Sequence, residues 1–205
     1  MERKKIGIMG GTFNPIHYGH LMLAENAYEQ FELDQVLIMP AKNPYYKKIS
    51  SNITEQNRVE MIRLAIQDNP HFCFSDIELK REGNTYTVDT LTELAKEHPD
   101  VDYYFILGAD SLYHIESWKD TEKIFSLAKI VAASRADTYS AIDSQIEYLN
   151  DKYGAEVLRL NSPNLEISSS YLRRQLKAGK SCRYLLPDSV LSYMKEHKLY
   201  EERED

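Results

Sequence analysis

Short apolar runs alternate with amphipathic stretches along most of the chain. Two of these runs, 36–39 and 104–107, contain no charged residue, which is typical of strands covered on both faces of a parallel sheet. Runs of this kind predict strands at Lys5–Met9, Gln35–Met39, His71–Phe74, Asp102–Leu107, Lys129–Ala133 and Glu156–Leu160.

Between these runs the apolar residues recur at helical spacing. The pattern predicts helices at Tyr18–Phe31, Glu55–Gln67, Val88–Glu97, Thr121–Leu127 and Ala141–Tyr153, followed by two C-terminal helices at Ser169–Ala178 and Asp188–His197. Thr54 is a candidate N-cap, and Gly154 and Gly179 are candidate helix ends.

Regular alternation of strand and helix indicates an α/β protein. We predict a doubly wound, Rossmann-like, mostly parallel sheet with helices on both faces and a C-terminal helical segment. No repeat or linker interrupts residues 1–205, so we predict one domain. Such sheets bind ligands at the carboxyl ends of their strands, and the basic, tyrosine-rich stretch Pro40–Asn52 is predicted to be an active-site loop.

Composition narrows the class of protein. The 205 residues are 42% hydrophobic and 28% charged, with a formal net charge of −7, which argues against a general nucleic-acid binder because that function needs a basic face. Cys73 and Cys182 have no metal or disulfide spacing, and no run approaches the roughly 18 apolar residues of a membrane span. We therefore expect a cytoplasmic protein with no membrane or nucleic-acid partner; a homo-oligomer stays open.

The stretch Gly10–His20, GGTFNPIHYGH, lies between the first predicted strand and the first helix. A strand, a glycine turn and a helix start form a phosphate-binding geometry, because unpaired N–H groups and the positive end of the helix dipole face the ligand. The alternatives are a helix start with two surface histidines, or a zinc site. The plain helix start is disfavoured because each neighbouring residue type also has a use in binding. The zinc site is disfavoured because no Cys, His or carboxylate cluster accompanies His17 and His20 in the sequence.

A second motif, Ile167–Arg174, places Ser168, Ser169 and Ser170 at a predicted helix start. These hydroxyls can cap the helix and donate to phosphate, and Arg173 would add charge on the same face as Ser169. Serine-capped helices are common, so this motif alone is also compatible with a purely structural helix start.

Two further motifs lie between them. Gly108-Ala109-Asp110-Ser111 follows a predicted strand, where a carboxylate can bind a ribose hydroxyl, although Gly-x-Asp is also an ordinary turn. In Gly83–Leu91, Asn84 suits a turn and Thr87 suits an N-cap.

Together these motifs resemble a known superfamily. His17-Tyr18-Gly19-His20 and the later Ile-Ser-Ser-x-x-x-Arg pattern resemble the two signatures of nucleotidyltransferases. The pattern Tyr-Thr-x-Asp-Thr-Leu at 86–91, Gly-x-Asp-Ser at 108–111 and Trp118-Lys119 resemble one branch, the bacterial nicotinate-nucleotide adenylyltransferases. The resemblance runs from Lys5 to about Leu199.

The resemblance implies transfer of the adenylyl group of ATP to nicotinate mononucleotide, giving deamido-NAD and pyrophosphate, with Mg²⁺ carried in by ATP. It implies catalytic roles for His17, His20 and Arg173. The implied ATP-binding residues also include Gly10, Gly11, Thr12, Phe13, Gly108, Asp110, Arg135, Ile167, Ser168 and Ser169. The implied acceptor-binding residues are Lys42, Lys47, Thr87, Asp89 and Trp118, with the nicotinate ring near Trp118 and its carboxylate near Thr87.

Two departures from the family pattern affect individual residues. Pro44-Tyr45-Tyr46-Lys47 replaces the usual Pro-Pro-His-Lys, and Arg135-Ala136-Asp137 replaces Arg-Pro-Gly. Three alternative functions stay open: a sister enzyme acting on nicotinamide mononucleotide or phosphopantetheine, a catalytically silent nucleotide sensor, and a hydrolase using the two histidines on a metal.

Overall fold

A central parallel sheet organises the computed structural model, which describes residues 3–42, 53–133, 139–163 and 165–201. Its strands are β1 (Lys4–Gly11), β2 (Gln35–Pro40), β3 (Phe72–Phe74), β4 (Val101–Gly108), β5 (Lys129–Ala133) and β6 (Val157–Leu160). They lie in the order β3-β2-β1-β4-β5-β6, and every neighbouring pair is parallel. The chain therefore winds outward in both directions from β1 and β4.

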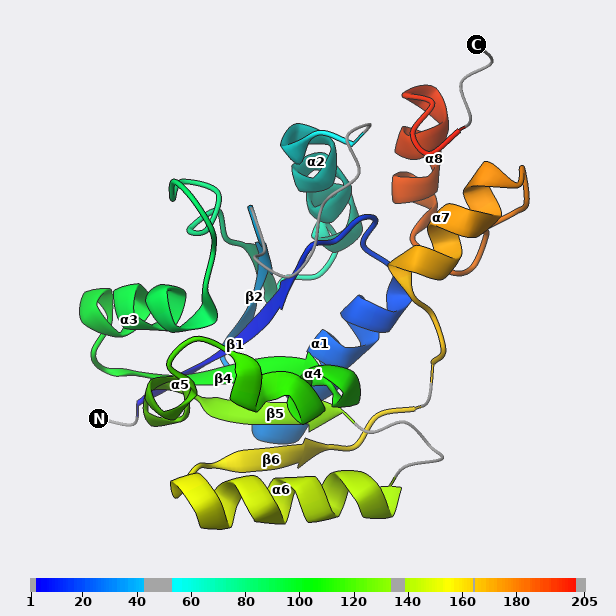
Figure 1. The fold of residues 1–205 in the computed structure, drawn as a ribbon. Coiled ribbons are helices and arrows are strands. Elements are labelled where there is room, and N and C mark those ends of the chain that lie inside the picture. The colour runs from blue at the N-terminus through cyan, green and yellow to red at the C-terminus, as the bar shows by residue number, and fades with distance from the viewer. Residues whose placement is uncertain (1–2, 43–52, 134–138, 164, 202–205) are drawn as a thin grey trace.

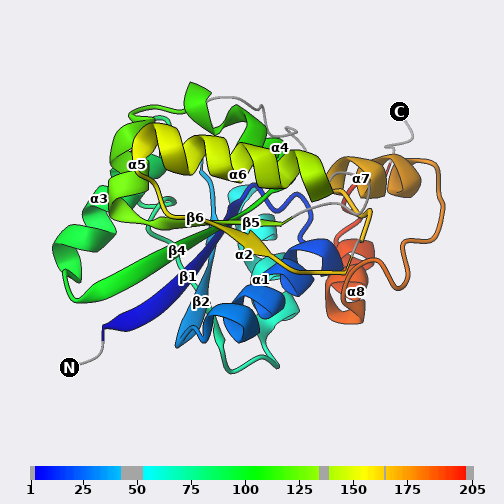
Figure 2. The same cartoon turned by 90° about the horizontal axis from the view of Figure 1, so that it is seen from below.

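Helices cover both faces of the sheet (Figures 1 and 2). They are α1 (Tyr18–Phe31), α2 (Glu55–Ile66), α3 (Thr87–Glu97), α4 (Ala109–His114), α5 (Thr121–Leu127), α6 (Tyr139–Tyr153), α7 (Ser169–Lys177) and α8 (Asp188–Glu196), with a 3-10 turn, η1, at Ile115–Ser117. The predicted doubly wound fold with a C-terminal helical segment is thus confirmed.

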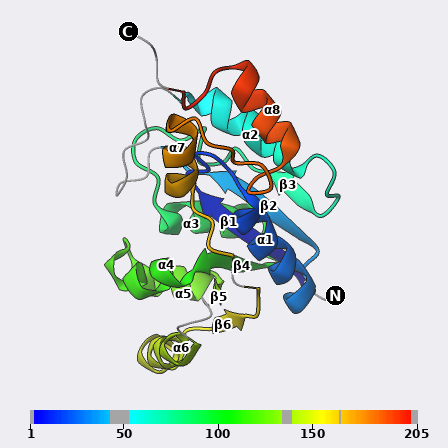
Figure 3. The same cartoon turned by 90° about the vertical axis from the view of Figure 1, so that its right-hand side faces the viewer.

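One apolar core lies on each face of the sheet. Buried residues of α1, α2, α7 and α8 pack on one face of the sheet, and those of α3, α4, α5 and α6 pack on the other. Figure 3 shows the two layers, with α7 and α8 beside α1 and α2. None of the helices in the described ranges is long and apolar enough to cross a membrane.

Local chemistry explains most element boundaries. The Thr54 hydroxyl caps α2 by accepting from Asn57 N at 3.1 Å, and Gly154 and Gly179 take the left-handed conformation (φ 59° and 65°) just after α6 and α7. Two predictions were wrong in detail: β1 continues through Gly10 and Gly11, and no helix was predicted where the structure has α4. Residues 43–52 of the predicted active-site loop lie outside the described residues.

Candidate active site

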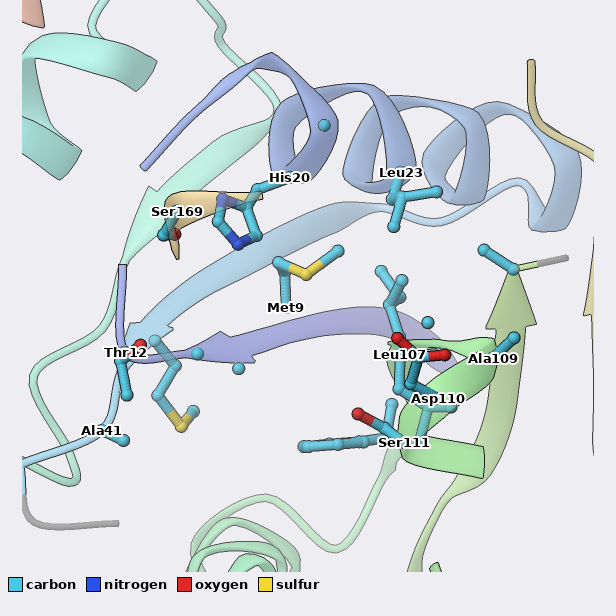
Figure 4. A pocket seen from close by; sticks show the side chains of 18 of the residues that line it. Met9, Thr12, His20, Leu23, Ala41, Leu107, Ala109, Asp110, Ser111 and Ser169 are labelled. Atoms are coloured by element: carbon cyan, nitrogen blue, oxygen red, sulfur yellow. The ribbon is translucent and has the colours of Figure 1, made fainter. Parts of the chain in front are cut away.

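A cavity of about 470 Å³ opens at the carboxyl ends of β1 and β4. These two strands are neighbours from which the chain winds in opposite directions, the place where open α/β sheets bind ligands. Figure 4 shows His20 and Ser169 on one side of the cavity and Asp110 and Ser111 on the other, with Met9 between them. The cavity therefore joins the motifs that are far apart in the sequence.

The turn after β1 is held by side chains from the C-terminal part of the chain. The Ser169 hydroxyl donates to Pro15 O at 2.9 Å, and Arg173 Nη1 donates to Asn14 O at 2.8 Å. The Tyr200 hydroxyl donates to Asn14 Oδ1 at 2.5 Å, and burial raises the pKa of Tyr200. These contacts fix the backbone that leads into α1.

The two histidines of this turn are stacked, with ring centroids 3.7 Å apart. His17 is 4% exposed, and burial lowers its pKa to about 4, so the ring is neutral at pH 7. The backbone N–H of His17 donates to His20 Nδ1 at 3.3 Å, which leaves the proton of a neutral His20 ring on Nε2. The buried ring of Phe13 packs edge-on against His20. His20 is therefore oriented as a hydrogen-bond donor at the cavity.

Gly19 lets the His17 ring approach the helix. A Cβ built on Gly19 would lie 3.0 Å from His17 Nδ1 and 3.1 Å from its Cε1. The backbone oxygen of Ile167 would lie 3.5 Å from the same Cβ, so the tightest contact at Gly19 is with the side chain of His17.

Four helices begin at the cavity. The N-cap residues of α1, α3, α4 and α7, which are His17, Tyr86, Gly108 and Ser168, all line it. The N-caps of α3 and α4 make no side-chain capping bond, so the backbone N–H groups of those first turns can be satisfied by a ligand. Four positive helix ends favour anionic ligands, even in a chain with net charge −7.

An aromatic wall closes one end of the cavity. Trp118 lies edge-on to Phe105, with centroids 6.1 Å apart and an interplanar angle of 88°. Beside it, Lys119 Nζ lies 4.7 Å from the centre of the Tyr86 ring and 3.2 Å from Asp89 Oδ2. A flat ring with a negative substituent suits this end, which offers an aromatic face, a cation and the N-terminus of α3.

A carboxylate also lines the cavity wall. Glu78 accepts from the Thr90 hydroxyl at 2.9 Å, and the same hydroxyl accepts from Arg81 Nη1 at 2.9 Å. Burial raises the pKa of Glu78, against the opposing effects of Thr90 and Arg81.

Gly108 faces open space. A Cβ at this position would meet no atom within 4 Å, and its φ of −82° is one that any residue can adopt. No neighbour within that distance therefore requires a glycine there, whereas a ligand lying against the backbone would.

The structure brings most predicted site residues together. Gly10, Gly11, Thr12, His17, His20, Thr87, Gly108, Asp110, Trp118, Ile167, Ser168 and Ser169 line the cavity. Phe13, Lys42, Asp89 and Arg173 are not among its lining residues: Phe13 lies in the core under His20, Asp89 pairs with Lys119, and Arg173 binds Asn14 O. Lys47 and Arg135 lie outside the described residues.

Sequence reasoning missed several lining residues, including Met9, Met39, Glu78, Thr85, Phe105 and Lys119. The two methionines and Phe105 belong to strands, where they were assigned to the core. For Lys119 a signal existed, because it follows the single tryptophan.

Comparison with known proteins agrees with this geometry. A family model described as Cytidylyltransferase-like matches residues 8–175. A protein of Lachnoclostridium phytofermentans named "Probable nicotinate-nucleotide adenylyltransferase" is 51% identical over 198 residues, which cover 96% of this chain and 99% of that protein. A Synechococcus protein with the same name is 41% identical, over 97% of this chain and 96% of its own.

Solved structures show the same fold. A Plasmodium falciparum nicotinic acid mononucleotide adenylyltransferase complexed with NaAD superposes with a TM-score of 0.80 at 22% identity, covering 96% of this chain and 97% of that one. The same enzyme complexed with APC gives a TM-score of 0.77 with the same coverage.

Proposed function

This chain belongs to the cytidylyltransferase-like family and, within it, to the nicotinate-nucleotide adenylyltransferases. We propose that it transfers the adenylyl group of ATP to nicotinate mononucleotide and that the reaction takes place in this cavity. The protein is a nucleotidyltransferase. The products of the proposed reaction are deamido-NAD and pyrophosphate. The observation that carries the proposal is the convergence of four helix N-termini, His20 and the Trp118 wall on one cavity.

The chemistry asks for positioning rather than for a general base. A phosphate oxygen of the acceptor nucleotide, already anionic, attacks the α-phosphorus of ATP in line. The bond from that phosphorus to the oxygen bridging to the β-phosphate breaks, and pyrophosphate leaves. Negative charge develops on the α-phosphate oxygens and on the leaving group, so preorganised donors accelerate the step.

We assign the ATP half of the cavity to the turn after β1 and to the start of α7. Gly10, Gly11 and Thr12 shape the turn, and His20 donates from Nε2 to the α-phosphate. His17, neutral and stacked beneath it, fixes the orientation of that ring.

The β- and γ-phosphates are assigned to the start of α7. Ser168 is the N-cap of this helix and Ser169 is its first residue, and the N–H groups of the first turn face the cavity. Arg173 holds Asn14 O here, so contact with phosphate would require it to give up or share that bond. Lys42, Lys47 and Arg135 stay proposed ATP or acceptor contacts.

The acceptor half is assigned to the other end. The nicotinate ring stacks on Trp118, and its carboxylate accepts from backbone N–H groups at Thr87, the first residue of α3. Asp110, in the first turn of α4, accepts from a ribose hydroxyl.

Mg²⁺ enters this proposal with ATP. The ion is commonly held by phosphate oxygens and water with few protein ligands. Within the described ranges no group of three His, Cys, Asp or Glu side chains is placed to hold a metal. We also propose a cytoplasmic location, where ATP is available and both free cysteines would stay reduced.

Pyrophosphate release from ATP tests the proposal. Nicotinate mononucleotide, nicotinamide mononucleotide and phosphopantetheine are supplied in parallel at equal concentration. We expect the fastest release with nicotinate mononucleotide and formation of deamido-NAD. Release with phosphopantetheine alone, or with none of the three, would overturn the acceptor assignment.

A further inference from the structure

Arg58, in α2, is the largest fully buried side chain of the described residues, with 1% of its surface exposed. It makes no ion pair with a described carboxylate; Glu55 and Tyr200 act on it only through space. Burying a guanidinium without a counter-ion is expensive, so its hydrogen bonds must offset much of the cost.

Among the described residues, Arg58 donates to two backbone carbonyls at the edge of the cavity. Arg58 Nη1 donates to Thr12 O and to Ala41 O, both at 2.8 Å. Thr12 follows β1 and Ala41 follows β2, and both residues line the cavity (Figure 4).

The position of this contact relative to the sheet is informative. The pairing of β1 with β2 ends at Gly11 and Pro40, and Ala41 N donates to Gly11 O as a last link at 2.8 Å. Beyond it, one chain enters the turn that leads to His17 and the other continues to Lys42. Arg58 joins the two chains where the backbone ladder stops.

We propose that Arg58 is a positioning residue for the ATP half of the cavity, an inference that rests on the proposed function. It does not line the cavity, so it acts through Thr12 and Ala41 rather than on the nucleotide. By fixing both carbonyls it sets the direction in which the phosphate-binding turn leaves β1. The Trp118 end of the cavity is built by other elements and does not depend on this contact.

The test separates the two halves of the site. Arg58→Met removes both donated bonds, and Arg63→Met is the control, because Arg63 is an exposed arginine on the same helix, stacked 5.1 Å over Phe74. We measure the affinity for a non-hydrolysable α,β-methylene analogue of ATP by calorimetry, and KM for each substrate by pyrophosphate release.

In Arg58→Met we expect kcat/KM for ATP to fall about 10²-fold, as when a reacting group is displaced by about 1 Å. Affinity for the analogue should fall about 10-fold, and KM for nicotinate mononucleotide should change less than about twofold. Arg63→Met should match the wild type. Unchanged analogue affinity in folded Arg58→Met, or equal losses for both substrates, would overturn the inference.

Arg58→Lys covers the case in which the methionine variant does not fold. Its ammonium keeps the charge and can donate to one carbonyl, so losses specific to ATP should be smaller but measurable. Wild-type ATP parameters in this variant would also overturn the inference. If the wild type makes no product with nicotinate mononucleotide while Arg58 variants alone lose analogue affinity, the proposed function fails and the positioning role stands.

Discussion

Two residues separate His17 from His20, yet water reaches the two rings unequally. His17 is buried against Gly19, while His20 is partly exposed at the cavity with its orientation fixed from three sides. In the proposed reaction only His20 therefore donates directly to the developing charge.

His20→Ala should remain folded and lose about 10²–10³ in kcat, the typical effect of removing one preorganised donor. His197→Ala is the matched control, because His197 is an exposed histidine beyond the end of α8. Pyrophosphate release at saturating substrates measures both variants. Normal turnover in His20→Ala would contradict the donor assignment.

His17 makes stability depend on pH. Its pKa of about 4 in the folded state lies below the ordinary 6.5, so the unfolded chain takes up a proton first as the pH falls. The free energy of unfolding should therefore fall between pH 6.5 and pH 4. By linkage the loss from pH 7.5 to pH 5.0 is about 2 kcal/mol.

Urea unfolding of the wild type and of His17→Gln at the two pH values checks this. Other titrating groups act on both proteins alike, so the difference between their pH dependences isolates His17. An identical pH dependence would show that His17 does not carry the effect.

Replacing Gly19 or Gly108 by alanine should impair the enzyme in two different ways. At Gly19 a methyl group would press on the His17 ring, so Gly19→Ala should lower kcat about 10-fold or more despite the better helix propensity of alanine. At Gly108 a methyl group would enter open space, so the free energy of unfolding should stay within about 0.5 kcal/mol while substrate affinity falls. Thermal unfolding and steady-state kinetics on both variants separate these effects.

At the scale of elements, the helix starts contribute to both stability and binding. Ser168 caps α7 through Tyr171 N at 3.2 Å, and Thr54 caps α2 through Asn57 N at 3.1 Å. Replacing either by alanine should cost about 1 kcal/mol of stability. Only Ser168→Ala should also raise KM for ATP, because Ser168 lines the cavity and Thr54 does not. Equal kinetics in the two variants would remove α7 from the ATP site.

The periodicity of the sequence predicted every strand and most helices, because the cores on the two faces require apolar residues at those spacings. It missed α4, whose six residues give too little periodicity to detect. Gly10 and Gly11 were predicted to end β1, but both stay in the ladder, because pairing with Met39 and Pro40 overrides the low strand propensity of glycine.

Long-range contacts explain what was missed in the site. The spacing of Ser169 and Arg173 predicted a shared anion, yet both donate to carbonyls of the turn after β1. Their partners are more than 150 residues away in sequence, and local spacing carries no information about them. Local spacing carries equally little information about Arg58, whose two carbonyl partners lie at the ends of β1 and β2.

At the scale of the whole molecule, the chain carries a net charge of −7, although both proposed substrates are anions. Attraction at the cavity comes from helix ends and a few side chains, which act over short distances. Salt should therefore not slow the association of nicotinate mononucleotide, because it screens the repulsion from the rest of the surface as much as any attraction.

Trp118 provides the signal for this measurement, since it is the single tryptophan and lines the cavity. Stopped-flow fluorescence between 10 and 150 mM salt should show a rate constant that is unchanged or slightly raised. A steep fall would instead reveal a strong local basic field at the cavity.

The bond from Tyr200 to Asn14 joins positions 186 residues apart. During synthesis on the ribosome, the turn after β1 is therefore made 186 residues before its partner Tyr200. Until Tyr200 has been added and folded back, the side chain of Asn14 lacks this hydrogen bond. A nascent chain that already carries both histidines thus still lacks one of the contacts that hold the turn between β1 and α1 in place.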